Sequence, residues 1–202
     1  MERAPAPARV SPHIDGGVLS AAVRSAVSKA QDEHEPATGI DAAVGALHDA
    51  VPSLFPAAFV LEHSRLWLVA QRGYAVVPDG IRVEQGIVGR AVRVGSPQLV
   101  LDLEADTDYI RVLPSVVCEL AVPLEVGGTV VGALNLEAER PLPEDAAELF
   151  QPLTTALAPL AEALQARSVL DLGALARLFV HLGGLREPEA IAGLAAASLA
   201  RV

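Results

Sequence analysis

Residues 116–138 carry the clearest structural signal in the chain, the sequence VVCELAVPLEVGGTVVGALNLEA. Two runs rich in valine and leucine, 116–126 and 129–138, flank Gly127-Gly128. Because glycine takes positive φ without steric cost, a Gly-Gly pair suits the two-residue turn that joins antiparallel strands. The stretch therefore predicts a β-hairpin in an antiparallel sheet.

Further strands and helices are predicted on both sides of this hairpin. Short apolar runs predict a second hairpin and two single strands, at 58–62 with 66–70, at 81–83 and at 98–102. Apolar residues at helical spacing predict helices over 18–30, 40–51 and 144–167. Pro52 and Pro56 should end the second of these, and Pro152 and Pro159 should kink the third or delay its start to about Pro152. This order predicts an α+β fold with about six antiparallel strands and helices on both sheet faces.

The segment 84–102, EQGIVGRAVRVGSPQLVLD, has three glycines whose role is conformational rather than catalytic. Gly86, Gly89 and Gly95 do not match the spacing of a phosphate-binding loop, and the only lysine of the chain is Lys29. We expect Gly86 to open a short helix and Gly95 to end it in the left-handed conformation.

Composition excludes several classes of function. The chain has 202 residues, of which 51% are hydrophobic and 3% aromatic, so the core is built from aliphatic side chains. A net charge of -10 without a basic run argues against binding to nucleic acid or to an anionic membrane. No apolar run reaches the roughly 18 residues of a membrane span, so we expect a cytoplasmic protein. Cys118 is the only cysteine and the five histidines are dispersed, so we expect no metal site.

Residues 40–165 resemble the GAF family of sensory domains. The resemblance rests on several short pieces in the order found in that family: EQGIVGRAV with Gly95, VLD leading to Tyr109, AVPL, VVGALNLE, and the Glu144-Asp145 start of the last helix. It implies a GAF-like antiparallel sheet with a small-molecule pocket between the sheet and residues 86–114. The expected organisation is a flexible leader at 1–15, the GAF-like domain at 16–168 and a helical extension at 169–202.

The extension has alternative interpretations. Its apolar spacing continues to residue 202 without a capping residue, so we expect a sensor fragment whose output domain is missing from this chain. Residues 169–202 also look like the opening helices of a second GAF-like unit. The alternative is a helical lid that folds back on the domain.

Seven residues are candidates for ligand binding if the resemblance holds. Asp102, Tyr109 and Arg111 lie on the segment that would close the pocket, where they could pair with an anionic or purine-like ligand, or simply be solvated. Cys118 and Glu119 are neighbours on a strand, so only one of them can line the pocket. The remaining two candidates are Asn135, a polar residue in an apolar strand, and Trp67, for which core packing is the alternative.

The resemblance also implies limits on activity. Free methionine sulfoxide reductases of this family use more than one cysteine, and Cys118 alone cannot complete a thiol relay. The residues typical of cyclic-nucleotide binding are reduced to Asp145. We find no catalytic constellation and no cofactor signature, and we expect a non-enzymatic sensor that binds an unknown small molecule.

Homodimerisation is the second expected property. A leucine seam along the last helix, Leu153, Leu157, Leu160 and Leu164, is predicted to meet a partner copy. The alternatives are a pure dimerisation scaffold whose pocket is filled by its own side chains and, third, a reductase-like enzyme.

Overall fold

The computed structural model describes residues 13–75 and 80–183. The chain divides after Gln165 into two units, and the fold described here is that of the first. The second unit begins at Ala166 and contains the end of the last helix, up to Gly183. Residues 1–12 of the predicted 1–15 leader and residues 184–202 of the predicted 169–202 extension lie outside the described residues.

One antiparallel sheet of six strands forms the centre of the domain. The strand order is β3-β2-β1-β6-β5-β4, and every neighbouring pair is antiparallel. The strands are β1 Leu54–Glu62, β2 Arg65–Gln71, β3 Ile81–Arg82, β4 Gln98–Val100, β5 Cys118–Val126 and β6 Thr129–Ala138. This is the α+β architecture predicted from the sequence, with six antiparallel strands.

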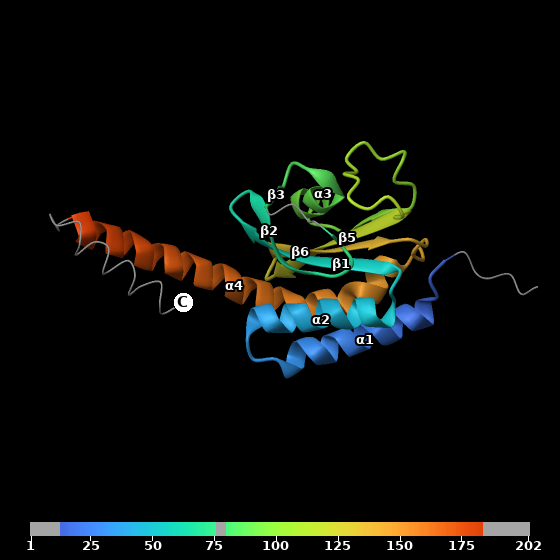
Figure 1. Cartoon of the computed structure of the whole chain (residues 1–202), viewed down its shortest axis with the longest axis horizontal. Helices are drawn as coiled ribbons and strands as arrows, with labels where there is room; N and C mark the ends of the chain where they lie inside the picture. Colours follow the sequence, from blue (N-terminus) through green and yellow to red (C-terminus); the bar gives the residue numbers. More distant parts are fainter. Residues whose placement is uncertain (1–12, 76–79, 184–202) are drawn as a thin grey trace, which may run out of the picture. The chain divides into compact units, whose positions relative to one another are not determined.

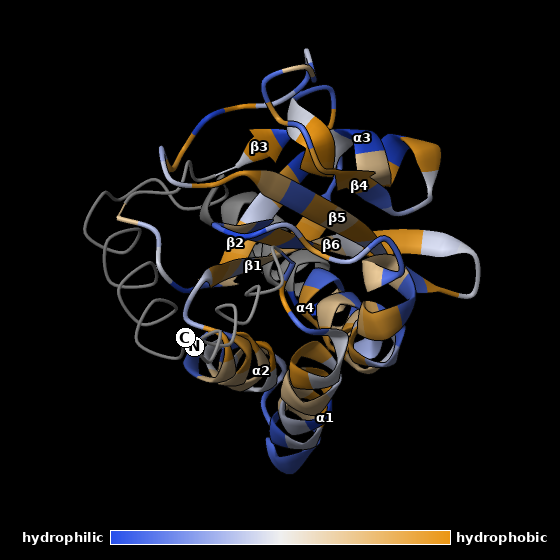
Figure 2. Cartoon of the chain, turned by 90° about the vertical axis from the view of Figure 1, so that its right-hand side faces the viewer, coloured by the Kyte–Doolittle hydropathy of each residue, from blue (hydrophilic) through white to orange (hydrophobic). Residues whose placement is uncertain are grey.

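Helices cover both faces of the sheet (Figures 1 and 2). Three of them lie on one side, called the helix face: α1 Gly16–Asp32, α2 Pro36–Ala50 and the first part of α4 Ala146–Gly183. On the other side, called the pocket face, lie the short helix α3 Gly86–Val94 and residues 101–117, called the cover loop. Asp15 caps α1 by accepting a hydrogen bond from the Val18 amide at 3.0 Å.

The two faces have separate hydrophobic cores because successive strand residues point to opposite sides. The helix-face core includes Leu134 and Leu136 of β6, and the pocket-face core includes Ala133 of the same strand. Ile87 and Val88 of α3 pack into the pocket-face core. Along each strand, side chains of the pocket face therefore alternate with side chains that belong to the other core.

The predicted glycine roles of the central hairpin and of α3 are confirmed. Gly127 and Gly128 have φ values of 57° and 83°, and Gly95 ends α3 with a φ of 68°. Gly89 serves close packing instead, since a Cβ atom at this position would lie 2.5 Å from the Val83 carbonyl oxygen. None of these glycines is needed to hold a phosphate.

Several predicted element boundaries are wrong, and prolines cause most of the errors. Helix α2 begins at Pro36 rather than at the predicted residue 40, because a proline in the first helical turn lacks only an amide hydrogen that would not be bonded there. Pro56 was expected to end a helix but lies within β1, opposite Leu136. Helix α4 starts at Ala146, ahead of the prolines, because its buried face, including Phe150, packs from the first turns onward.

The leucine seam is also corrected in part. Leu153 and Leu157 are completely buried and belong to the helix-face core of a single chain, so they cannot meet a partner copy. Leu160 and Leu164 are only partly buried against this core. Among the described residues, no helix is long and apolar enough to cross a membrane.

Candidate functional site

A cavity of about 260 Å³ lies on the pocket face of the sheet. Its walls come from the sheet, from α3 and from the cover loop, and most of them are apolar. The lining residues are Ala57, Phe59, Tyr74, Gly80, Ile81, Gln85, Gly86, Ile87, Val88, Ile110, Val112, Glu119, Asn135 and Glu137. A mostly apolar cavity with a few polar groups is the usual form of a small-molecule site.

The polar floor of the cavity is set by the register of β5 and β6. Glu119 of β5 lies directly opposite Glu137 of β6, and the next pocket-facing position of β6 is Asn135. Their exposed fractions are 5% for Glu119, 3% for Glu137 and 8% for Asn135. Two carboxyl groups are therefore held side by side in a nearly water-free place, because directly opposite side chains on neighbouring strands are in contact range.

Several polar atoms around this floor lack partners within the described part of the chain. They are Asn135 Oδ1, Glu137 Oε2 and the hydroxyl of Tyr109 on the cover loop. Tyr74, which follows β2, instead donates its hydroxyl proton to the Phe55 carbonyl oxygen at 2.9 Å. A buried polar atom without a hydrogen bond costs about 1–3 kcal/mol of free energy. The site therefore contains polar atoms that would gain from a hydrogen-bonding partner.

The site shifts the protonation of both carboxyl groups. Burial, followed by the neighbouring Glu137 charge, raises the pKa of Glu119 to about 8. Burial likewise raises the pKa of Glu137 to about 7, although the nearby Tyr74 hydroxyl opposes the increase. The pKa of Tyr109 rises to about 12, again through burial and then through the two glutamates. All three groups are thus more protonated than they would be in water.

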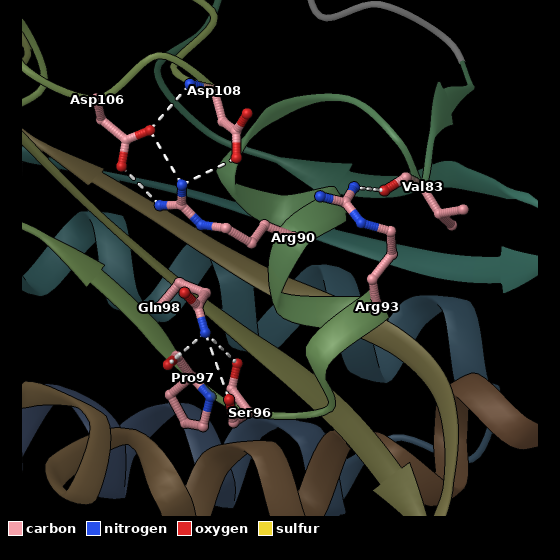
Figure 3. A network of polar contacts seen from close by, with 8 residues as sticks. All are labelled: Val83, Arg90, Arg93, Ser96, Pro97, Gln98, Asp106 and Asp108. Atoms are coloured by element: carbon pink, nitrogen blue, oxygen red, sulfur yellow. Dashed lines mark hydrogen bonds and ion pairs between the residues drawn. The ribbon is translucent and has the colours of Figure 1, made fainter.

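An ion-pair cluster ties the cover loop to α3, as Figure 3 shows. Arg90 Nη2 donates to Asp106 Oδ2 at 2.6 Å, and Arg90 Nη1 donates to Asp108 Oδ2 at 2.9 Å. Asp106 Oδ1 also accepts from the Asp108 amide at 2.9 Å, which forms a local turn. The hydrogen bond from Arg90 lowers the pKa of Asp106, so this carboxyl stays charged at neutral pH. The turn directly precedes Ile110, which lines the cavity.

Three of the seven candidate residues lie at or beside the cavity. Glu119 and Asn135 line it, and Tyr109 packs against the pocket-face core. Asp102 is exposed, and Arg111 is an exposed partner of Glu104, so neither contributes to the cavity lining.

Cys118 and Trp67 also lie away from the cavity lining. Cys118 points to the helix face, where it is fully buried and donates to the Arg140 carbonyl oxygen at 3.4 Å. Trp67 is 38% exposed, with the Arg65 guanidinium over its ring at 6.0 Å. It is therefore neither a cavity wall nor a fully packed core residue.

Three polar residues of the cavity lining were not among the candidates: Tyr74, Gln85 and Glu137. The signal for Glu137 was present in the sequence, because alternation along β6 places it on the same face as Asn135. Tyr74 comes from a turn beyond β2 and has no pattern that reveals its position. Within the described residues, no cluster of three His, Cys, Asp or Glu side chains is arranged to hold a metal ion.

Comparison with known proteins identifies the family to which the chain is similar. A GAF domain family model matches residues 34–160. None of the curated protein sequences matches the chain.

Two of the similar solved structures are free methionine-R-sulfoxide reductases. The enzyme from Neisseria meningitidis, solved with its substrate, has a TM-score of 0.68 at 20% identity, covering 78% of this chain and 96% of that chain. The type II enzyme from Thermoplasma acidophilum has a TM-score of 0.59 at 24% identity, covering 63% of this chain and 93% of that chain.

A third similar structure is the GAF domain of an Acinetobacter phosphoenolpyruvate-protein phosphotransferase. Its TM-score is 0.63 at 18% identity, and the match covers 74% of this chain and 96% of that chain. At such identities these three structures establish the fold alone, and the fold is shared by enzymes and by GAF domains of other proteins. Since the family model spans more than half of the sequence, the chain belongs to the GAF domain family.

Proposed function

We propose that this GAF domain is a non-enzymatic sensor that binds a small molecule in the cavity beneath the cover loop. The observation that carries the proposal is the cavity of about 260 Å³ with buried oxygen atoms that lack partners. A ligand that donates hydrogen bonds to Asn135 Oδ1 and Glu137 Oε2 would give both atoms a partner. Apolar contacts with Phe59, Ile87 and Val88 would supply the rest of the affinity.

The position of Cys118 argues against the reductase alternative. The similar enzymes are free methionine-R-sulfoxide reductases, and their fold alone makes this activity worth testing. Here the single thiol faces the opposite core, and burial raises the pKa of Cys118 to about 11. A thiol with such a pKa is almost entirely uncharged at neutral pH, and the thiolate is the nucleophilic form.

The cavity also favours the sensor over the scaffold alternative. In the scaffold hypothesis the pocket is filled by valine and leucine side chains of the domain itself, and an open volume speaks against this. Strand β5 offers a route for a signal, because Glu119 faces the cavity and its neighbour Leu120 packs in the helix-face core with α4. We propose that ligand binding shifts the packing of the cover loop and, through β5, of α4.

Native mass spectrometry of the purified chain, before and after denaturation, tests the proposal. A small molecule that co-purifies and is lost on unfolding is the expected result, and its mass identifies it. The variant Val112→Trp should lose the molecule, because Val112 lines the cavity. The matched control is Val117→Trp, on the same loop but 41% exposed and outside the cavity lining. Retention of the molecule by Val112→Trp would place binding elsewhere and contradict the proposal.

A further inference from the structure

The paired glutamates present an electrostatic problem for the ligand-free domain. Glu119 and Glu137 face each other across β5 and β6, and each is at least 95% buried. Negative charges on two directly opposite, buried residues repel strongly, because little water can screen them there. One Oε2 atom of the pair has no hydrogen-bond partner in the described chain. Such a pair relieves the repulsion by keeping a proton or by acquiring a positive partner.

Among residues 13–75 and 80–183, the charged and titratable groups around the pair supply no free cation. From α3, Arg90 influences Glu119 but is already bound to Asp106 and Asp108 of the cover loop. Asp106 itself raises the pKa of Glu119.

The remaining neighbours are neutral. The cover loop also contributes Tyr109, and the segment after β2 contributes Tyr74. A tyrosine is uncharged at neutral pH, and burial raises the pKa of both further. The facing residues of β1 are Phe55 and Ala57, which do not titrate. The cavity floor therefore has a surplus of acid over base.

We propose that Glu119 and Glu137 hold at least one proton in the ligand-free cavity and release a proton to solvent when a ligand brings a positive charge. The ligand class follows from the same geometry: a small organic cation, such as a protonated amine, with an apolar body that fits the cavity. The exchange balances, because the singly charged acid pair and the cation give a doubly charged pair bound to the cation, plus one free proton. This inference rests on the proposed function and specifies the chemistry of its site.

The proton can be detected without any ligand. Infrared spectra of the ligand-free protein from pH 5 to 9 should show the carbonyl band of a buried carboxylic acid, which persists at pH 7 and disappears above about pH 8. Glu119→Gln and Glu137→Gln should each weaken this band at pH 7. Glu125→Gln, at an exposed position of the same strand, should leave it unchanged. Absence of the band in the wild-type protein at pH 6 would overturn the inference even if no variant folds.

The exchange is tested with n-butylammonium, and with n-butanol as the neutral molecule of the same shape. Titration calorimetry at pH 6, 7 and 8 should show tighter binding of n-butylammonium at higher pH, by up to tenfold per pH unit for one released proton. Repeating the titration in buffers of different ionisation enthalpy counts that proton.

The affinity of n-butanol should not increase with pH. Binding of n-butylammonium that is independent of pH, or absent at every pH, overturns the exchange. If the exchange fails in this way, a neutral molecule found by native mass spectrometry in the same cavity would still support the proposed function.

Discussion

Cys118 and Glu119 are neighbours in the chain with opposite environments, and this determines how each reacts. We predict that the Cys118 thiol of the folded protein resists a disulfide reagent at pH 8, because it is fully buried and its pKa is about 11. Absorbance at the wavelength of the released thiolate gives the rate, and the thiol should react at once in denaturant. Val117→Cys in a Cys118→Ala background is the control, since Val117 is 41% exposed. Rapid reaction of Cys118 in the folded state would refute the prediction.

Two glycines of the α3 region should differ in their tolerance of a methyl group. Gly89→Ala places a Cβ atom 2.5 Å from the Val83 carbonyl oxygen, so we expect a loss of about 2–4 kcal/mol in unfolding free energy. At Gly95 nothing lies within 4 Å and only the positive φ is unfavourable, so Gly95→Ala should cost about 1 kcal/mol. Urea denaturation measures both values. Equal losses would show that the close approach of α3 to Val83 is not a constraint.

At single positions the sequence predicts the face of a side chain better than its exposure. Alternation along β5 correctly allowed only one of Cys118 and Glu119 in the pocket. Asp102 and Arg111 were chosen because they lie on the closing segment, yet both are exposed. Whether a loop side chain turns inward depends on tertiary contacts that have no periodic signature.

Among the described residues, Arg90 makes the ion pairs between α3 and the cover loop, beside the apolar contacts of the pocket-face core. Arg90→Gln removes its ion pairs with Asp106 and Asp108, a loss of about 1.5 kcal/mol, which increases the opened fraction of the loop about tenfold. Limited digestion with trypsin should then cut faster after Arg111, which lies in this loop. Arg93→Gln is the control on the same helix, because Arg93 bonds the Val83 carbonyl oxygen rather than the loop. Equal digestion rates for the two variants would show that Arg90 does not hold the loop.

The apolar face of α4 separates core positions from positions available to a partner. Leu157→Glu should unfold the domain, since a charge in a completely buried site costs more than about 4 kcal/mol. Leu164→Glu should cost about 1 kcal/mol and convert the proposed homodimer to a monomer, because Leu164 is only partly buried. Thermal unfolding and light scattering after gel filtration report the two effects. A dimer that persists in Leu164→Glu excludes this end of the seam from the interface.

Elements with a strong local signal were predicted well, and elements decided by packing were not. The Gly127-Gly128 hairpin and the short helix α3 carry their own turn residues, so their ends are visible in the sequence. Prolines led to wrong element boundaries. The cost of a proline in a helix or strand depends on whether the backbone amide at that position would otherwise donate a hydrogen bond. Pro152 and Pro159 are both exposed on α4, and the buried opposite face of the helix outweighs their cost.

For the whole domain, the shifted carboxyl groups predict the pH of greatest stability. The pKa values of Glu119 and Glu137, about 8 and about 7 in the folded state, exceed the ordinary value, so the folded protein binds more protons than the unfolded chain. Stability should therefore fall as pH rises from about 4.5 to about 8. Asp41 and Asp106 have lowered pKa values beside Arg72 and Arg90, so their contribution is lost as pH falls below about 4.

The stability maximum is thus expected near pH 5. Urea midpoints measured from pH 3 to 9 test this, and Glu119→Gln should flatten the decline on the alkaline side. A maximum at pH 8 or above would contradict the assignment of protonated carboxyl groups to the cavity.

The separation of the two cores by a single sheet has a consequence for the way such a domain can change over time. Residues 119, 135 and 137 line the cavity, whereas 118, 120, 134 and 136 belong to the core on the helix face. Substitutions in the first set can alter ligand preference while the second set keeps the fold intact. The side chains that face a ligand and those that pack against the helices can therefore be exchanged at alternate positions of the same two strands, in evolution or by design.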